Sequence, residues 1–296
     1  MTVAVRWVVM FLAFLAGAGP AVAGVPETNS AASLRAKFAS LSVQLGHNQF
    51  QRALYLESSE SPNESKGDSY ALVEYPFATV DAALSSPTHW CDVMMLHLNT
   101  KYCHASTDKA RSTLMLSVGK KFNQPLTDAY KFEFAFRVAT ESSDYLRVQM
   151  NADNGPLGTN NYRIMLEAVP VEGGRTFLHL TYSYAYGLVG RVAMQAYLAT
   201  TGRNKVGFTV TGTQPDGQPD YVRGVRGIVE RNTMRYYLAI DAYLSAFAAP
   251  AAEQFERRLQ YWFDAIERYP RQLHEMERTA YLDMKRSERL REQASQ

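Results

Sequence analysis

Apolar and polar residues alternate along the middle of the chain. Every second side chain of 130–138 is apolar or aromatic, with charged residues between most of them. In 178–186, Leu178, Leu180 and three tyrosines share one face, and His179 lies on the other. A period of two is typical of strands whose two faces differ, and the Gly- and Asn-rich segments 151–161 and 171–175 read as hairpin turns. The pattern predicts an antiparallel meander of about six strands.

Helical periodicity dominates on either side of this meander. Residues 34–45 carry leucines at helical spacing, and 227–247 form a long helix with one apolar face that includes Asn232 and Tyr236. Segment 188–202 has Arg191 as its only charge, so we expect a helix that is mostly buried or covers apolar groups. Two more helices are predicted over 251–296.

These patterns divide the chain into four parts. Residues 1–23 read as a signal peptide, and 24–68 as an N-terminal helical segment followed by a polar linker over 57–68. Segment 69–247 holds the strands and the long helix. Residues 251–296 form a C-terminal helical extension.

The first 23 residues indicate export. Arg6 precedes a short apolar run that ends in Ala21-Val22-Ala23, the pattern of a signal peptide cut after Ala23. An uncleaved anchor is the alternative, but the run is shorter than the roughly 20 residues of a membrane span. We therefore expect a periplasmic or secreted protein.

The charge balance bears on the class of partner. The chain has 31 Lys and Arg against 29 Asp and Glu, and removal of Arg6 with the signal peptide leaves 30 against 29, or +1. Nucleic-acid binding normally uses a strongly basic face, so the sequence favours no nucleic-acid partner.

The segment 89–104, HWCDVMMLHLNTKYCH, contains both cysteines and three of the six histidines. A disulfide between Cys91 and Cys103 suits an exported protein. A metal site is the less favoured reading, because the spacings match no zinc pattern, and two free thiols are a further alternative. We expect no metal and no cofactor. His97 and Asn99 alternate with leucines, so a strand with both facing away from those leucines is predicted.

The order of elements resembles the helix-grip fold of the START-like lipid-transfer and polyketide-cyclase superfamily. The segment EYPFATVDAALSSPTHWCDVM (74–94), with Trp90, has the look of the short helices that follow the first strand in that superfamily. The resemblance implies an α+β fold in which a curved antiparallel sheet grips a long C-terminal helix. The helix of 188–202 is then an insertion, and the helices after 250 are extra.

The resemblance also implies an apolar ligand held between the sheet and the helix. The residues predicted to contact it are Tyr130, Phe134, Tyr182, Tyr184, Asn232 and Tyr236. A filled core is the alternative for the aromatic faces, and a structural hydrogen bond is the alternative for Asn232.

Catalytic motifs are absent from the sequence. It has no G-x-S-x-G, H-E-x-x-H, P-loop or G-x-G-x-x-G pattern. His97 and His179 could act as bases only if they faced a pocket. Four arginines lie near the start of the long helix and could hold an anionic head group: Arg223, Arg226, Arg231 and Arg235. Ion pairing with Glu230 and other acids is the alternative.

Three functions follow from these patterns. The favoured one is binding or carriage of a hydrophobic small molecule or lipid, with 188–202 as a lid or as an element for peripheral membrane contact. An enzyme for a small hydrophobic substrate is the second. An envelope scaffold that docks partners through the C-terminal helices is the third.

Overall fold

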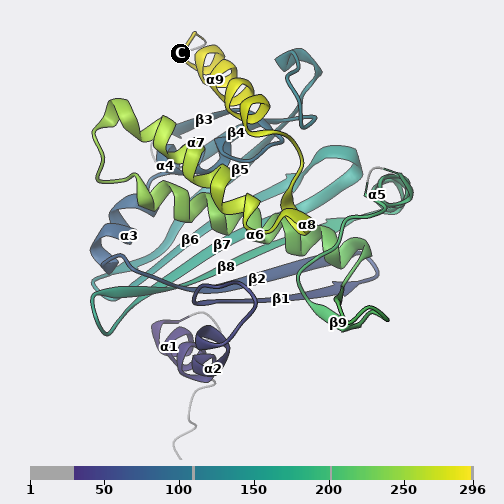
Figure 1. Ribbon diagram of the computed structural model, residues 1–296. Helices are drawn as coiled ribbons and strands as arrows, with labels where there is room; N and C mark the ends of the chain where they lie inside the picture. Colours follow the sequence, from purple (N-terminus) through teal and green to yellow (C-terminus); the bar gives the residue numbers. More distant parts are fainter. Residues whose placement is uncertain (1–29, 109–110, 201, 295–296) are drawn as a thin grey trace, which may run out of the picture.

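The alternating segments form one curved antiparallel sheet (Figure 1). The structure is a computed structural model, and it describes residues 30–108, 111–200 and 202–294. The predicted signal peptide lies outside these residues. Within them the sheet has eight strands in the order β1-β2-β8-β7-β6-β5-β4-β3. The strands are β1 (Leu54–Ser61), β2 (Glu64–Val73), β3 (Thr100–Asp108), β4 (Arg111–Val118), β5 (Tyr130–Ser142), β6 (Tyr145–Asn154), β7 (Thr159–Val171) and β8 (Arg175–Tyr186).

The helices lie on both sides of this sheet. Helix α6, the long helix, lies against the concave face, and a small second sheet of β9 (Val210–Thr213) and β10 (Pro219–Tyr221) precedes it. The helices are α1 (Ala31–Ser40), α2 (Ser42–Gly46), α3 (Phe77–Leu84), α4 (Pro87–Met95), α5 (Leu188–Ala199), α6 (Gly224–Ser245), α7 (Ala251–Glu267), α8 (Pro270–Leu273) and α9 (Arg278–Ala294). No helix among the described residues is long and apolar enough to cross a membrane.

The α+β helix-grip arrangement expected from the sequence is confirmed. Helix α6 packs against β1, β2 and β8, and the main core lies between it and the concave face of the sheet. The sharp β7–β8 turn is made by Gly173 and Gly174, which both have positive φ (79° and 70°). Glycine adopts that conformation without steric cost, which suits the three-residue turn between the paired Val171 and Arg175.

Gly67 on β2 sets how closely α6 can approach the sheet. A Cβ atom at this position would lie 2.2 Å from the Thr233 hydroxyl oxygen of α6. The contact is possible because glycine has no side chain, so the helix backbone lies nearly on the strand.

The expected linker over 57–68 is wrong. These residues form the end of β1 and the start of β2, two antiparallel strands paired from Leu54 with Ala71 to Ser61 with Glu64. The polar composition that read as a linker reflects a hairpin whose tip is exposed.

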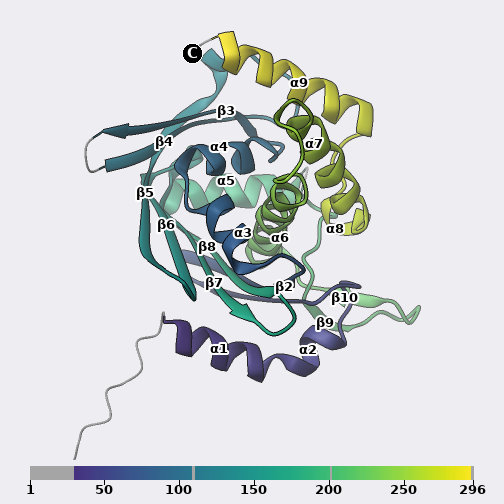
Figure 2. The same ribbon diagram turned by 90° about the vertical axis from the view of Figure 1, so that its left-hand side faces the viewer.

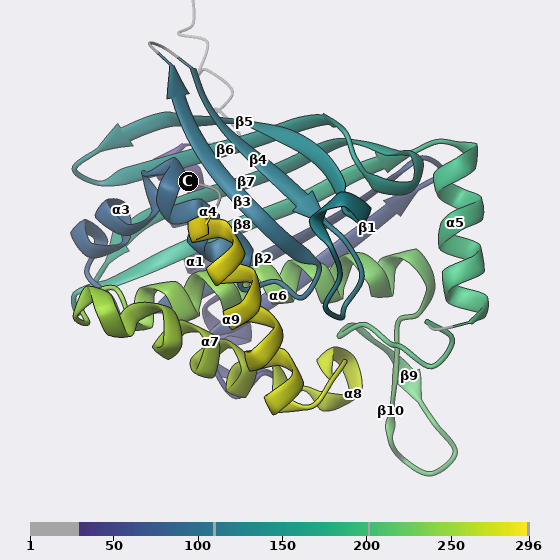
Figure 3. The same cartoon turned by 90° about the horizontal axis from the view of Figure 1, so that it is seen from above.

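Two further expectations about local structure are wrong. His97 and Asn99 lie in the turn between α4 and β3, not in a strand. Helix α5 is mainly exposed rather than mostly buried, with Leu188 and Val189 at 77% and 69% exposure. The alternative expectation, that 188–202 covers apolar groups, is confirmed, because Met194 packs against the main core. Figure 3 shows α5 at one end of the sheet.

Helices α7 and α9 pack into the main core. Trp262 of α7 stacks on Tyr281 of α9 at 5.1 Å between ring centroids, and both side chains are fully buried. Figure 2 shows these helices on the concave side of the sheet, opposite α1 and α2.

The convex face of the sheet carries a second, smaller core. The N-terminal helices α1 and α2 pack against aromatic residues of the sheet, among them Phe177. They do so through Leu34, Leu41 and Leu45. Phe38 of α1 also meets Phe177, at 4.9 Å between centroids. The leucine spacing of the N-terminal segment therefore marks the face by which it covers the sheet.

A buried charged cluster lies beside this second core. His179 of β8 bonds to Asp68 through Nε2 (2.8 Å) and to Glu167 through Nδ1 (2.9 Å), and its ring stacks on Tyr70 at 4.2 Å. Burial lowers the pKa of His179, but the two carboxylates outweigh burial and hold it above its ordinary value of 6.5. His179 therefore lies on the convex face, away from the concave core.

We predict that this cluster makes stability depend on pH. Because the pKa of His179 is raised on folding, its contribution is full below pH 6.5 and is lost as the pH rises through the folded-state pKa. Chemical denaturation across pH 5 to 9 should show this fall for the native protein and not for His179→Gln. At pH 6 the variant should lose about 3 kcal/mol, because both carboxylates lose their shared partner. Parallel pH profiles for the two proteins would contradict the prediction.

Candidate ligand-binding cavity

A cavity of about 500 Å³ opens between the sheet, α6 and the turn that follows α4. A second compartment of about 260 Å³ extends from it under α5. Both are lined by Asn99, Pro156, Leu157, Tyr162, Tyr182 and Asn232, so they are neighbouring parts of one hollow. We call the first the outer compartment and the second the inner compartment.

Aromatic side chains from three strands and α6 form one wall of the cavity. Tyr162 of β7 lies at its centre, 6.0 Å from Phe132, 6.2 Å from Tyr182 and 5.5 Å from Tyr184 between ring centroids. Tyr236 of α6 approaches Tyr182 to 5.2 Å. The aromatic rings therefore make the wall apolar, and the tyrosine hydroxyls are its polar groups.

Five of the six residues predicted from the sequence to contact a ligand line this cavity. They are Tyr130, Tyr182, Tyr184, Asn232 and Tyr236. Phe134 does not line it, because its ring is buried edge-on against Phe132 and Tyr162. The role of the five residues as ligand contacts stays a prediction.

The site prediction missed Phe132 and Tyr162. Phe132 belongs to the alternating face of β5, and Tyr162 lies two positions before Ile164, which pairs with Tyr182 across the sheet. The alternation of apolar and polar residues along the two strands could therefore have identified both residues. The cavity begins toward the ends of β4, β5 and β7, and that position depends on packing rather than on local sequence.

Asn232 makes the structural hydrogen bond considered for it, and its role as a ligand contact stays a prediction. Its Oδ1 accepts a hydrogen bond from Arg235 Nη1 (3.4 Å), and its side chain bonds to the Tyr182 hydroxyl. It also lines both compartments. Burial raises the pKa of Tyr182 well above 10, so its phenol stays protonated in the pH range of life.

His97 lines the outer compartment and carries a buried hydrogen-bond donor. Its Nδ1 accepts from the Asn99 backbone N–H (3.2 Å), which places the proton of a neutral ring on Nε2. Nε2 is buried and has no hydrogen-bond partner among the described residues. Burial lowers the pKa of His97 well below 6.5, and the charge of Arg235 adds to the effect. The ring is thus neutral and stacks on Tyr236 at 5.2 Å.

Helix α9 holds the turn that carries His97. Lys285 donates to the carbonyls of His97 (2.7 Å) and Thr100 (2.8 Å), and the Tyr281 hydroxyl donates to Leu96 O (2.9 Å). Glu288 pairs with Lys285 at 2.8 Å and with the equally buried Lys101 at 2.9 Å. These contacts fix the backbone on both sides of His97.

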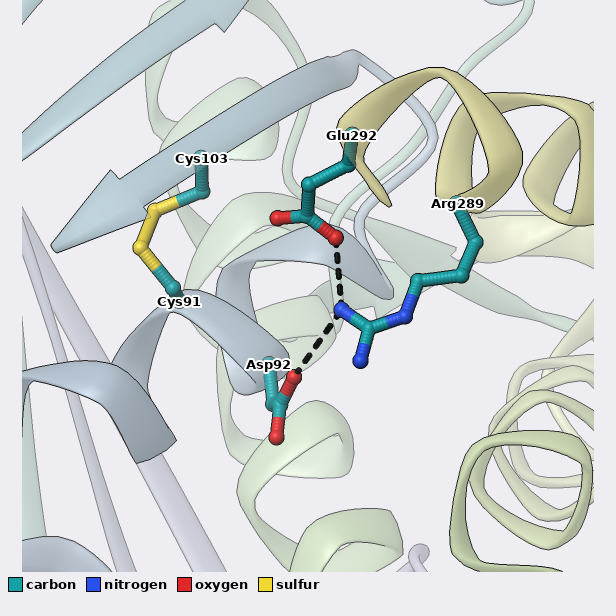
Figure 4. The surroundings of a disulfide bond; sticks show 5 residues. All are labelled: Cys91, Asp92, Cys103, Arg289 and Glu292. Carbon is teal, nitrogen blue, oxygen red and sulfur yellow. Dashed lines mark hydrogen bonds and ion pairs between the residues drawn. A yellow bond between two sulfur atoms is a disulfide. The ribbon is translucent and has the colours of Figure 1, made fainter. Parts of the chain in front are cut away.

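The disulfide expected between Cys91 and Cys103 is confirmed. It joins α4 to β3 across the same turn, with the two Cα atoms 5.3 Å apart. Figure 4 shows the adjacent pairing of Arg289 of α9 with Asp92 (3.7 Å) and Glu292 (2.6 Å). Since the cysteines bond each other, a metal site built on them is wrong, and the described residues contain no other cluster able to hold a metal ion.

The inner compartment is lined by three cationic side chains, Lys121, Arg231 and Arg235. Glu275 pairs with Arg235 and Lys121, each at 2.7 Å. The arginines were noted in the sequence as candidates for an anionic head group, and the structure brings two of them to the cavity. Arg223 and Arg226 do not line it.

No protein-family model matches the chain, and no curated protein sequence matches it. Among solved structures it is similar to truncated norcoclaurine synthase from Thalictrum flavum, with 15% identity, 49% of this chain and 89% of that chain covered, and a TM-score of 0.34. It is also similar to human StAR-related lipid transfer protein 5, with 11% identity, coverage of 57% and 89%, and a TM-score of 0.31. A conserved protein from Geobacillus kaustophilus matches with 14% identity, coverage of 48% and 85%, and a TM-score of 0.31.

Proposed function

We propose that this protein is exported and that it binds or carries an apolar, lipid-like ligand in the cavity between the sheet and α6. The observation that carries the proposal is the cavity itself, with compartments of about 500 and 260 Å³ and a continuous aromatic wall. Small-molecule sites have this size and this mixture of apolar lining with few polar groups. A filled core, the alternative reading of the aromatic faces, would leave no such space.

The polar groups of the cavity favour binding over catalysis. The lone pair of His97 Nδ1 is occupied by the Asn99 N–H, so the ring offers a donor and no free base. His179, the second candidate base, is on the convex face between two carboxylates.

Helix α5 is the element through which we propose that the protein touches a membrane. Leu188, Val189 and Val192 are exposed, and Leu157 lies exposed on the adjoining turn that also lines the cavity. Gly158 of that turn packs against Val189. An apolar surface beside the cavity would let a lipid pass from the bilayer without crossing water.

Export is supported by two independent features. The first 23 residues have the pattern of a cleaved signal peptide, and the Cys91–Cys103 disulfide is typical of proteins outside the cytoplasm.

We predict that filling the cavity abolishes binding of a neutral apolar probe. Val118 lines the outer compartment at the end of β4, so Val118→Trp would occupy the space of the ligand. The affinity for N-phenyl-1-naphthylamine, measured by fluorescence titration, should fall by about tenfold or more, since overpacking excludes the probe. Val43→Trp is the matched control, because Val43 is 70% exposed on α2. No probe binding by the native protein, and no lipid in its native mass spectrum, would overturn the proposed function.

We predict that the triple variant Leu188→Ser, Val189→Ser, Val192→Ser no longer floats with vesicles of phosphatidylethanolamine and phosphatidylglycerol. Each side chain lost removes about 1.5 kcal/mol or more of apolar burial in the bilayer. Val43→Ser controls for loss of an exposed valine elsewhere. Equal flotation of the triple variant and the native protein would contradict a membrane contact through α5.

We predict the covalent form of the mature protein. Intact-mass measurement on protein from the producing cells should give a chain that begins at Gly24 and is about 2 Da lighter than the reduced form, because one disulfide removes two hydrogens. A chain that retains Arg6, or two free thiols, would contradict export with cleavage.

A further inference from the structure

The inner compartment has more positive than negative charge at its wall. Lys121, Arg231 and Arg235 line it, and Lys205 lies next to them through its 3.4 Å pairing with Glu275. Glu275 is the one carboxylate that ion-pairs with any of these four among the described residues. Three cations therefore share a single anion, and the fourth, Arg231, pairs with no carboxylate of the described residues.

Arg231 is the least compensated of the four. Arg231 is only 2% exposed. Within the described chain its one hydrogen bond is donated by Nη1 to the carbonyl of Val206 (3.2 Å). No carboxylate of the described residues lies within ion-pairing distance of it. A buried guanidinium without a counter-charge costs several kcal/mol, which an incoming anion would offset.

Arg235, one turn further along α6, has spare donor capacity. It reaches Glu275 through Nη2 (2.7 Å), and its buried Nε has no partner among the described residues. Burial, followed by the charge of Arg235, lowers the pKa of Lys121 to about 8. The outer compartment differs, since Lys120 and Asp128 both line it and their formal charges cancel.

We infer that the ligand of this cavity is an amphipathic anion, with a carboxylate or phosphate group held by Arg231 and Arg235 in the inner compartment. Its apolar body lies against the aromatic wall of Tyr162, Tyr182 and Tyr236 and extends into the outer compartment. Guanidinium groups match carboxylate and phosphate oxygens in geometry and charge. The inference rests on the proposed function and specifies the chemical class of its ligand.

The test compares probes that share one chain and differ in charge. Dodecanoate, dodecyl phosphate and 1-dodecanol each displace N-phenyl-1-naphthylamine, a neutral dye, in competition titrations with the native protein. The two anions should bind about tenfold or more tighter than the alcohol, as charge-assisted hydrogen bonds do relative to neutral ones. A preference for one anion identifies the carboxylate or the phosphate as the natural group.

Arg231→Met should remove this preference, weakening both anions by about tenfold while 1-dodecanol binds as before. Because Arg231 has no carboxylate partner among the described residues, the variant leaves none of them unpaired. Arg231→Lys keeps the charge without the planar fork and should retain part of the preference. Arg223→Met is the matched control, since Arg223 is exposed at the start of the same helix and outside the cavity.

The outcomes separate the two proposals. Equal binding of the alcohol and the anions, or an unchanged preference in Arg231→Met, overturns the anionic ligand and leaves the apolar cavity standing. Displacement by none of the three probes, together with no binding of the dye, overturns the proposed function itself. Acetate or inorganic phosphate that binds as tightly as the dodecyl anions also overturns the inference, because the apolar body would then contribute nothing.

Discussion

The contact between Gly67 and Thr233 controls the rest of the architecture. At this point α6 approaches β2 with only the small Thr233 side chain against the glycine. The helix packs on β1, β2 and β8, whereas the cavity is lined mainly from β4, β5 and β7, with Tyr182 of β8 and residues of α6. Close packing on one part of the sheet thus leaves room over another part. The space that separates helix and sheet there is the space in which we place the ligand.

The sequence predicted what local patterns can specify. Alternation located β5 and β8, and the apolar stripe of α6 was found to within three residues of its ends. Gly67 was misread because a glycine in a polar stretch looks like a loop until its partner across the core is known. His97 was misplaced for the same reason, since the carbonyl contacts that hold its turn come from α9, almost 190 residues later. Long-range contacts of this kind have no local signature.

The cavity combines an apolar wall with a buried charge, and each raises the free energy of the empty cavity for a different reason. Its aromatic wall, including Tyr162 and Tyr184, gains little from contact with water. Its inner end holds Arg231 away from solvent without a carboxylate among the described residues. A molecule that is apolar along its length and charged at one end would relieve both costs at once. The site is in this sense complementary to an amphiphile, and less so to a purely apolar or a purely ionic compound.

The attachment of His97 to Lys285 has a consequence for the order of assembly. The turn that forms one side of the site is covered by the final helix, whose Tyr281 and Lys285 bond to its carbonyls. A chain that is synthesised from its amino terminus would complete its sheet before this helix arrives. The binding site would then be the last part to become ordered. Any product cut short before α9 would keep the residues of the sheet but lose these contacts, so the turn that carries His97 would lack this anchor.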